Sequence, residues 1–229
     1  MRKAIGLSLL GICLLALVSV AAFGEDYHNK GIITINGGNQ AVYLGKPGPI
    51  TPHQRPSGKF YNNFNTNTSS LYTANQGWAI SDGSTLGEEF TQGNSFVSLK
   101  TGTTHSIIAA LSLAGGTGEN YVELRKDCTG VPCGPSTGDW QKGLGCHTLV
   151  QVTQTFGSCC AVVKAKCAAK LKKGKTYWVV MESNATDNTF TVWNWSNASN
   201  ALGTDDYNLN DGGWATNGNG NPQGAFSIQ

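Results

Sequence analysis

The residues best suited to bind a ligand are tryptophans beside a polar segment near the C-terminal end. Trp193, Trp195 and Trp214 lie in or next to residues 194–219, which are rich in Asn and Gly and which we expect to form a polar loop. A flat aromatic face can stack on a sugar ring or anchor a protein partner. Alternatively the tryptophans belong to the core, as we expect for Trp178 and Trp193. The candidate ligand-binding residues are Trp195, Trp214, Asn194, Asn210 and Asp211.

Acidic residues could supply a hydrolase site or a calcium site. Glycoside hydrolysis uses two facing carboxylates, but the adjacent Glu88 and Glu89 would point to opposite faces of a strand. We therefore predict no catalytic residues, with a carbohydrate-active hydrolase as the alternative function. Calcium prefers oxygen ligands, which Asp205, Asp206 and Asp211 could provide if they are not simply an acidic loop. No other cofactor is expected.

Nucleophilic catalysis is not expected either. The four histidines are not accompanied by a Gly-x-Ser-x-Gly sequence, which would place a serine on a sharp turn. Six of the seven cysteines follow residue 120, and an even number in an exported chain predicts disulfides rather than a metal site. Cys128 and Cys133 close a tight loop and should pair. Cys159 and Cys160 either bond to each other or bond separately to Cys146 and Cys167.

Residues 1–24 have the pattern of a secretory signal peptide. Two basic residues precede an apolar run over residues 7–22, and the small residues Ala22 and Gly24 suit cleavage before Glu25. A membrane anchor is the alternative, because the run approaches spanning length. We expect the signal peptide, since the cleavage sequence follows directly. The mature protein should therefore be extracellular and have no membrane span.

The chain is nearly neutral, with a formal net charge of +2 and 13% charged residues. One basic cluster stands out and contains Lys164, Lys166, Lys170, Lys172, Lys173 and Lys175. Such a cluster can contact acidic glycans or nucleic acid, or it can keep a turn and its neighbouring sheet edges soluble. We favour the solvated turn and expect no nucleic-acid partner.

Short strands separated by Gly-rich and Asn-rich turns account for most of the chain. Residues 176–182 carry aromatic and β-branched side chains on both faces, which predicts a strand at the centre of a sandwich. Residues 121–125 alternate polar and apolar, as a strand with one wet face should. Residues 161–171 could be helical, but Val162 and Val163 favour a strand.

These patterns predict an all-β, jelly-roll-like antiparallel β-sandwich, stapled by disulfides, over residues 60–229. Residues 25–59 are rich in Pro and Gly, which predicts an N-terminal arm or linker with one possible strand at Ile32–Ile35.

Several short motifs occur in a characteristic order. They are Tyr61-Asn62-Asn63-Phe64, Gly77-Trp78, Glu89-Phe90-Thr91, Gly130-Val131-Pro132, Trp140, Phe156-Gly157-Ser158-Cys159-Cys160, Tyr177-Trp178-Val179-Val180, Trp193, Gly213-Trp214 and Gly224-Ala225-Phe226. Over residues 60–229 this order resembles the choice-of-anchor R domains, a family of secreted bacterial proteins of unassigned function. The resemblance implies an exported β-sandwich and transfers no catalytic residue. It also implies a Cys159–Cys160 bond, because that pair looks like a family feature.

Members of that family often carry a C-terminal anchor, which this chain lacks, so we expect release from the cell. The sequence thus predicts a secreted, non-catalytic protein. It would bind an extracellular glycan or protein partner, or act as a surface or matrix component.

Overall fold

The computed structural model describes residues 30–36, 39–134, 144–184, 188–198, 202–210 and 212–229. These ranges contain strands and loops and no α-helix, so none of them holds a helix long and apolar enough to cross a bilayer. The strands in chain order are β1 (Ile33–Asn36), β2 (Gln40–Tyr43), β3 (Tyr61–Asn62), β4 (Gln76–Asp82), β5 (Glu89–Val97), β6 (Gly102–Thr103), β7 (Ser106–Ala109), β8 (Leu111–Gly116), β9 (Glu119–Lys126), β10 (His147–Gln151), β11 (Val163–Lys166), β12 (Lys170–Leu171), β13 (Thr176–Ser183), β14 (Thr189–Asn194), β15 (Leu202–Leu209), β16 (Trp214–Pro222) and β17 (Phe226–Ile228).

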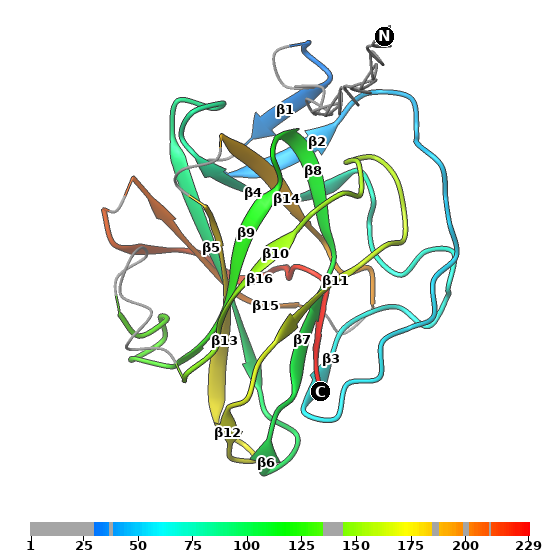
Figure 1. The fold of residues 1–229 in the computed structure, drawn as a ribbon. Helices are drawn as coiled ribbons and strands as arrows, with labels where there is room; N and C mark the ends of the chain where they lie inside the picture. Colours follow the sequence, from blue (N-terminus) through cyan, green and yellow to red (C-terminus); the bar gives the residue numbers. More distant parts are fainter. Residues whose placement is uncertain (1–29, 37–38, 135–143, 185–187, 199–201, 211) are drawn as a thin grey trace, which may run out of the picture.

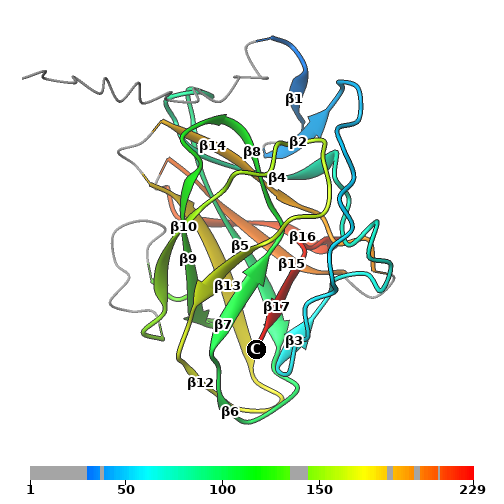
Figure 2. The ribbon, with the colours of Figure 1, turned by 45° about the vertical axis from the view of Figure 1, so that its right-hand side comes forward.

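Two antiparallel sheets pack against each other (Figures 1 and 2). The larger sheet has the order β1-β2-β4-β5-β13-β9-β10; in addition, β14 pairs with β4 and β8, and β15 pairs with β5 and β16. The smaller sheet has the order β11-β7-β17-β3, and β12 pairs with β6 at one end of the sandwich. The main hydrophobic cluster draws side chains from both sheets, among them Val179 and Phe226. The predicted fold class, an all-β sandwich with disulfides, is confirmed.

Strand β13 occupies the central position that its sequence predicts. It pairs with β5 on one side and with β9 on the other. Tyr177, Val179 and Met181 face the core between the sheets. Trp178 and Val180 point to the opposite face of the large sheet and are also buried. Because the side chains on both faces of β13 are apolar and buried, other segments of the chain must pack over the outer face of the large sheet.

That cover comes from the loop after β9 and from β16. A Cβ placed on Gly93 of β5 would lie 3.0 Å from Pro132 of the loop and 3.3 Å from Trp214 of β16. The expectation that residues 121–125 have one wet face is wrong. Glu123 and Arg125 point to this covered face, and each is only 1% exposed.

Strands β15 and β16 correct a second expectation from the sequence. Residues 194–219 have the composition of a polar loop, yet β15 and β16 form an antiparallel pair and β15 also pairs with β5. Asn, Asp and Gly are poor strand formers. The neighbouring strand β5 nevertheless offers backbone partners for β15, and satisfying those groups outweighs weak intrinsic preference.

The N-terminal segment contains more strand than the sequence predicts. The expected strand at Ile32–Ile35 corresponds to β1, and a further strand, β2, pairs with both β1 and β4. Residues 44–59 then run along one side of the sandwich to β3 (Figure 1). Residues 161–171, for which a helix was the alternative, form β11 and β12. The predicted signal peptide lies outside the described residues.

Three disulfides involve all six cysteines that follow the N-terminal segment. Cys128 pairs with Cys133, as predicted. Cys159 bonds to Cys160, and Cys146 bonds to Cys167, which selects one of the two arrangements that the sequence left open. Cys146 immediately precedes β10 of the large sheet, and Cys167 immediately follows β11 of the small sheet. This bond therefore ties the two sheets together at one edge of the sandwich.

Candidate functional site

Two of the predicted ligand-binding residues are buried inside the fold. Trp195 is 8% exposed and packs edge-on against Trp78 of β4, with ring centroids 5.2 Å apart. Asn194 is fully buried; its side-chain oxygen accepts a hydrogen bond from Ser112, and its amide nitrogen donates to the carbonyl of Thr73. Neither residue offers a stacking face or an amide to a ligand at the surface.

The remaining candidates lie on or near β16. Trp214 is half-buried; its indole nitrogen donates to the carbonyl of Gly134 at 3.1 Å, and its ring lies 5.9 Å from the Arg125 guanidinium carbon. Asn210 is exposed and accepts a hydrogen bond from the Glu89 amide at 2.8 Å. Asp211 lies outside the described residues. Trp214 therefore covers a charged residue on the sheet instead of standing free beside Trp195.

Beneath this cover is a buried ion cluster that sequence reasoning missed. The Arg125 Nε donates to one oxygen of Glu123 at 2.6 Å, and His147 Nδ1 lies 2.6 Å from the other. The side chains of Glu123 and Arg125 are each 1% exposed, whereas that of His147 is 24% exposed. The His147 ring stacks on Tyr121 at 4.2 Å. The available signal was the i, i+2 spacing of Glu123 and Arg125, which places both on one face of a strand.

Asp206 and Glu123, two buried carboxylates of the large sheet, are not spaced like the paired carboxylates of a glycoside hydrolase. Asp206, Gly93, Val180 and Glu123 follow one another across four neighbouring strands. Strands are about 4.8 Å apart, so Asp206 and Glu123 are separated by roughly 14 Å at the backbone. Paired glycosidase carboxylates lie about 5 to 9.5 Å apart. Moreover, both oxygens of Glu123 are already occupied.

Asp206, one of the three calcium candidates, is fully buried on β15. Among the described residues, none lies within hydrogen-bonding distance of either carboxylate oxygen. Burial raises the pKa of Asp206 to about 6; the nearby Thr216 hydroxyl lowers this pKa, and the charge of Asp127 raises it. No group of three His, Cys, Asp or Glu residues suited to a metal occurs among the described residues. The side chain of Asp205, like the whole of Asp211, is not described.

The predicted basic cluster lies on the surface, together with one more lysine, and we call this set the lysine strip. It consists of Lys100, Lys164, Lys166, Lys170, Lys172, Lys173 and Lys175, all exposed. Alternation along β11 directs Lys164 and Lys166 outward. Lys100 joins the others because the turn before β13 packs on the β5–β6 loop. There the Gly174 amide donates to the Ser98 carbonyl at 2.8 Å.

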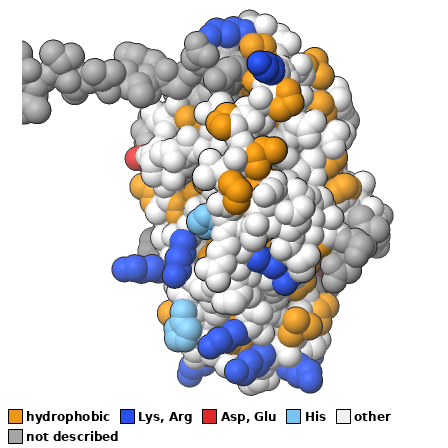
Figure 3. Space-filling model, turned by 90° about the vertical axis from the view of Figure 1, so that its right-hand side faces the viewer, with side chains coloured by type: hydrophobic (Ala, Val, Ile, Leu, Met, Phe, Trp, Pro, Cys, Tyr) orange, Lys and Arg blue, Asp and Glu red, His pale blue; other side chains and the backbone are white. Residues whose placement is uncertain are grey.

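The segments of the small sheet and its surroundings are basic. Segments 44–75, 98–111, 147–176 and 223–229, which form the small sheet and its surroundings, contain ten Lys and Arg residues and no Asp or Glu. On the face shown in Figure 3, Lys and Arg side chains gather towards the lower end. The overall charge of +2 thus conceals a strong separation of charge.

Comparison with known proteins yields no match: no family model, no curated protein and no solved structure is similar to this chain. The fold therefore defines only the class of the protein, which is an all-β sandwich containing disulfides. This arrangement is typical of extracellular proteins.

Proposed function

We propose that this chain is a secreted, non-catalytic protein that binds an anionic extracellular polysaccharide along the lysine strip. The observation that carries the proposal is the gathering of seven exposed lysines on segments 98–111 and 147–176, which contain no Asp or Glu. Such a surface concentrates polyanions by long-range attraction. The signal-peptide pattern, the disulfides and the resemblance to exported domains belong to the same proposal.

The chemistry of the strip favours a sugar polymer over a nucleic acid. Lysine ammonium groups are flexible, hydrated point charges, which suit carboxylates or sulfates at irregular spacing. Residues i and i+2 on a strand, such as Lys164 and Lys166, are about 6.6 Å apart, a spacing comparable with the length of one sugar residue. Residues 164–175 contain no aromatic side chain, whereas proteins that bind single-stranded nucleic acid stack bases on aromatic rings.

A binding assay on immobilised polymers tests this proposal. The mature chain, residues 25–229, should bind polygalacturonate or heparin at low salt, bind neutral dextran much less, and lose affinity as salt shortens the Debye length. Changing both Lys172→Gln and Lys173→Gln should weaken binding about 2- to 30-fold, since each exposed ion pair contributes roughly 0.2 to 1 kcal/mol.

The matched control changes two exposed lysines outside the strip, Lys46→Gln and Lys126→Gln, and so removes the same charge. This control should bind almost as well as the unchanged protein. If the two double variants lost the same amount of affinity, binding would depend on net charge alone, and the lysine strip would not be the binding site. If a DNA oligonucleotide bound more tightly than either polysaccharide, the strip would be assigned to nucleic-acid binding instead.

A further inference from the structure

The two sheets present unpaired edges to each other. Strand β10 is the last strand of the large sheet, and β11 is the first strand of the small one. They lie side by side, held at one end by the Cys146–Cys167 bond and by a 2.6 Å hydrogen bond from the Thr148 hydroxyl to the Lys166 carbonyl. Beyond this clamp the strands separate and leave a groove of about 400 Å³ between them.

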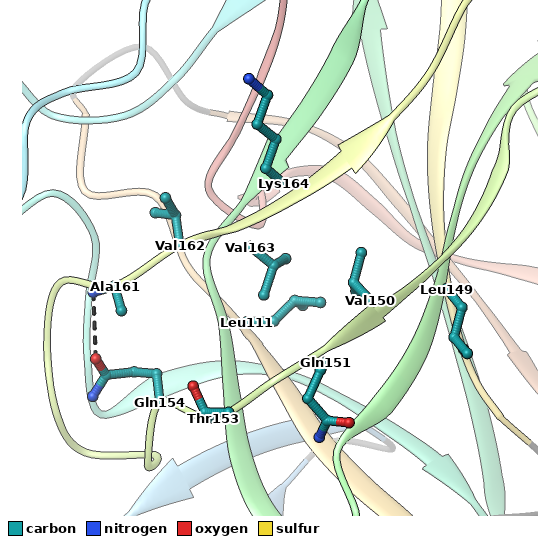
Figure 4. Close-up of a pocket in the computed structure, with 10 residues that line it drawn as sticks. All are labelled: Leu111, Leu149, Val150, Gln151, Thr153, Gln154, Ala161, Val162, Val163 and Lys164. Atoms are coloured by element: carbon teal, nitrogen blue, oxygen red, sulfur yellow. Dashed lines mark hydrogen bonds between the residues drawn. The ribbon is translucent and has the colours of Figure 1, made fainter.

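The groove has an apolar floor and a polar rim (Figure 4). Leu111, Val150 and Val163 converge at its centre. Thr153, Gln154 and Lys164 are polar residues that line it, and the far end is closed by a hydrogen bond from the Ala161 amide to the Gln154 side-chain oxygen at 3.3 Å. The exposed leucine of β10, Leu149, is 45% accessible beside this groove.

Strand β10 directs free backbone groups into the groove. The Leu124 amide donates to the Cys146 carbonyl, and the Val152 amide donates to the Gly118 carbonyl. In an antiparallel ladder, alternate residues bond to the neighbouring strand, so Thr148 and Val150 also bond to β9. The backbone groups of Leu149 and Gln151 therefore point away from β9, and no described residue bonds to them.

Strand β11, on the other side of the groove, also directs free backbone groups into it. The Cys167 amide donates to the His105 carbonyl, so Ala165 and Val163 bond to β7, and Lys164 and Lys166 point away from it. The bond from Thr148 to the Lys166 carbonyl shows that this direction leads to β10. Lys164 thus offers its amide and carbonyl to the groove, where no described residue bonds to them.

We propose that this groove receives an extended, acidic peptide segment of a protein partner as an added strand. A peptide backbone alternates donors and acceptors and can pair with a free strand edge, while side-chain pockets select its sequence. About four residues, at roughly 3.3 Å each, would lie along the gap. Inward side chains would contact Leu111, Val150 and Val163, and outward acidic ones would face Lys164 and Lys166. The acidic character follows from the exposed Lys164 and Lys166 on β11 and from the absence of Asp and Glu in residues 147–166, which contain both walls of the groove.

Lysine on a sheet edge also discourages accidental pairing between copies of a protein. That role accounts for Lys164, but it does not account for two edges that face each other over an apolar floor. The peptide proposal does not depend on polysaccharide binding, because it rests on backbone groups and on the groove.

Selection from a phage-displayed library of random heptapeptides on the mature chain tests the proposal. Enriched peptides should alternate acidic and β-branched residues. In complexes with the synthetic peptides, hydrogen exchange measured by NMR should slow at least tenfold at the amides of Leu149, Gln151 and Lys164. N-methylation of the peptide at alternate positions should reduce affinity at least fivefold, because each methyl group removes one backbone donor.

Variants separate this site from its surroundings. Lys164→Glu should weaken the binding of acidic peptides at least fivefold. Lys126→Glu, which changes an exposed residue of β9, should alter their affinity less than twofold. The Lys172→Gln and Lys173→Gln double variant should retain peptide binding even where it loses polysaccharide. The proposal is overturned if no peptide is enriched, if N-methylated peptides bind equally well, or if an acidic oligosaccharide alone protects the three groove amides.

Discussion

Removal of the Glu123 carboxylate should strongly destabilise the protein. This side chain holds Arg125 on one oxygen and His147 on the other, each at 2.6 Å, beneath the cover of Trp214 and the disulfide-closed loop. In a Glu123→Ala variant the guanidinium stays buried but loses a carboxylate partner that lies 2.6 Å from its Nε. Breaking one partner out of a buried pair costs about 3 to 5 kcal/mol, and the 1% exposure of both side chains places this pair in that class.

Equilibrium urea unfolding with disulfides intact measures the effect. With an m-value of about 2 to 3 kcal/mol per molar urea for a domain of this size, the unfolding midpoint should fall by roughly 1 to 2.5 M. The exposed acid Glu88 provides the control, since Glu88→Ala should change the free energy of unfolding by less than about 0.5 kcal/mol.

A double variant tests the reasoning further. Replacing Glu123→Leu and Arg125→Met together removes both charges and keeps apolar volume, so it should be considerably more stable than Glu123→Ala. A loss below about 1 kcal/mol in Glu123→Ala would show that water reaches the cluster, and the account of the covered outer face would then be wrong.

Two further predictions concern pH and disulfides. The pKa of Asp206 is raised from 3.8 to about 6 in the folded protein. Ionisation of this carboxyl therefore does not destabilise the fold below about pH 4, and the destabilisation grows as the pH rises to about 6. Asp206→Asn should therefore raise stability by about 1 to 3 kcal/mol above pH 7 and leave it unchanged at pH 3 in urea titrations; a pH-independent gain would contradict this. Replacing Cys146 and Cys167 by Ala should cost about 3 kcal/mol, roughly 1 kcal/mol more than the same change at Cys128 and Cys133, because 21 residues rather than 5 separate the bonded pair. Thermal scans that rank the two pairs in the opposite order would reject the loop-entropy argument.

Local pattern was sufficient for the central strand and the fold class. Residues 176–182 carry apolar and β-branched side chains on both faces, and such a segment is stable only between two layers. The close pair Cys128 and Cys133 could likewise be assigned from spacing alone. By contrast, the wet face expected at residues 121–125 was wrong, because alternation tells which side chains share a face but not what covers that face.

The candidate site was less predictable because binding residues depend on contacts between distant segments. Trp195 and Trp214 have similar sequence surroundings, rich in Asn and Gly. In the structure, however, Trp195 packs against Trp78 in the core, whereas Trp214 lies over Arg125. The lysine cluster, by contrast, can be recognised from the sequence because its six members lie within residues 164–175, on β11, β12 and the turn before β13.

The sequence by itself determined the all-β class, the central strand, the Cys128–Cys133 pair and the basic segment, because each depends on residues close together along the chain. Only the tertiary structure decided which strand edges remain unpaired, which charges are buried and where Trp214 lies. Those features arise where β5, β9, β10 and β11 meet segments distant from them in sequence, and the free energy of such contacts depends on three-dimensional packing rather than on local composition.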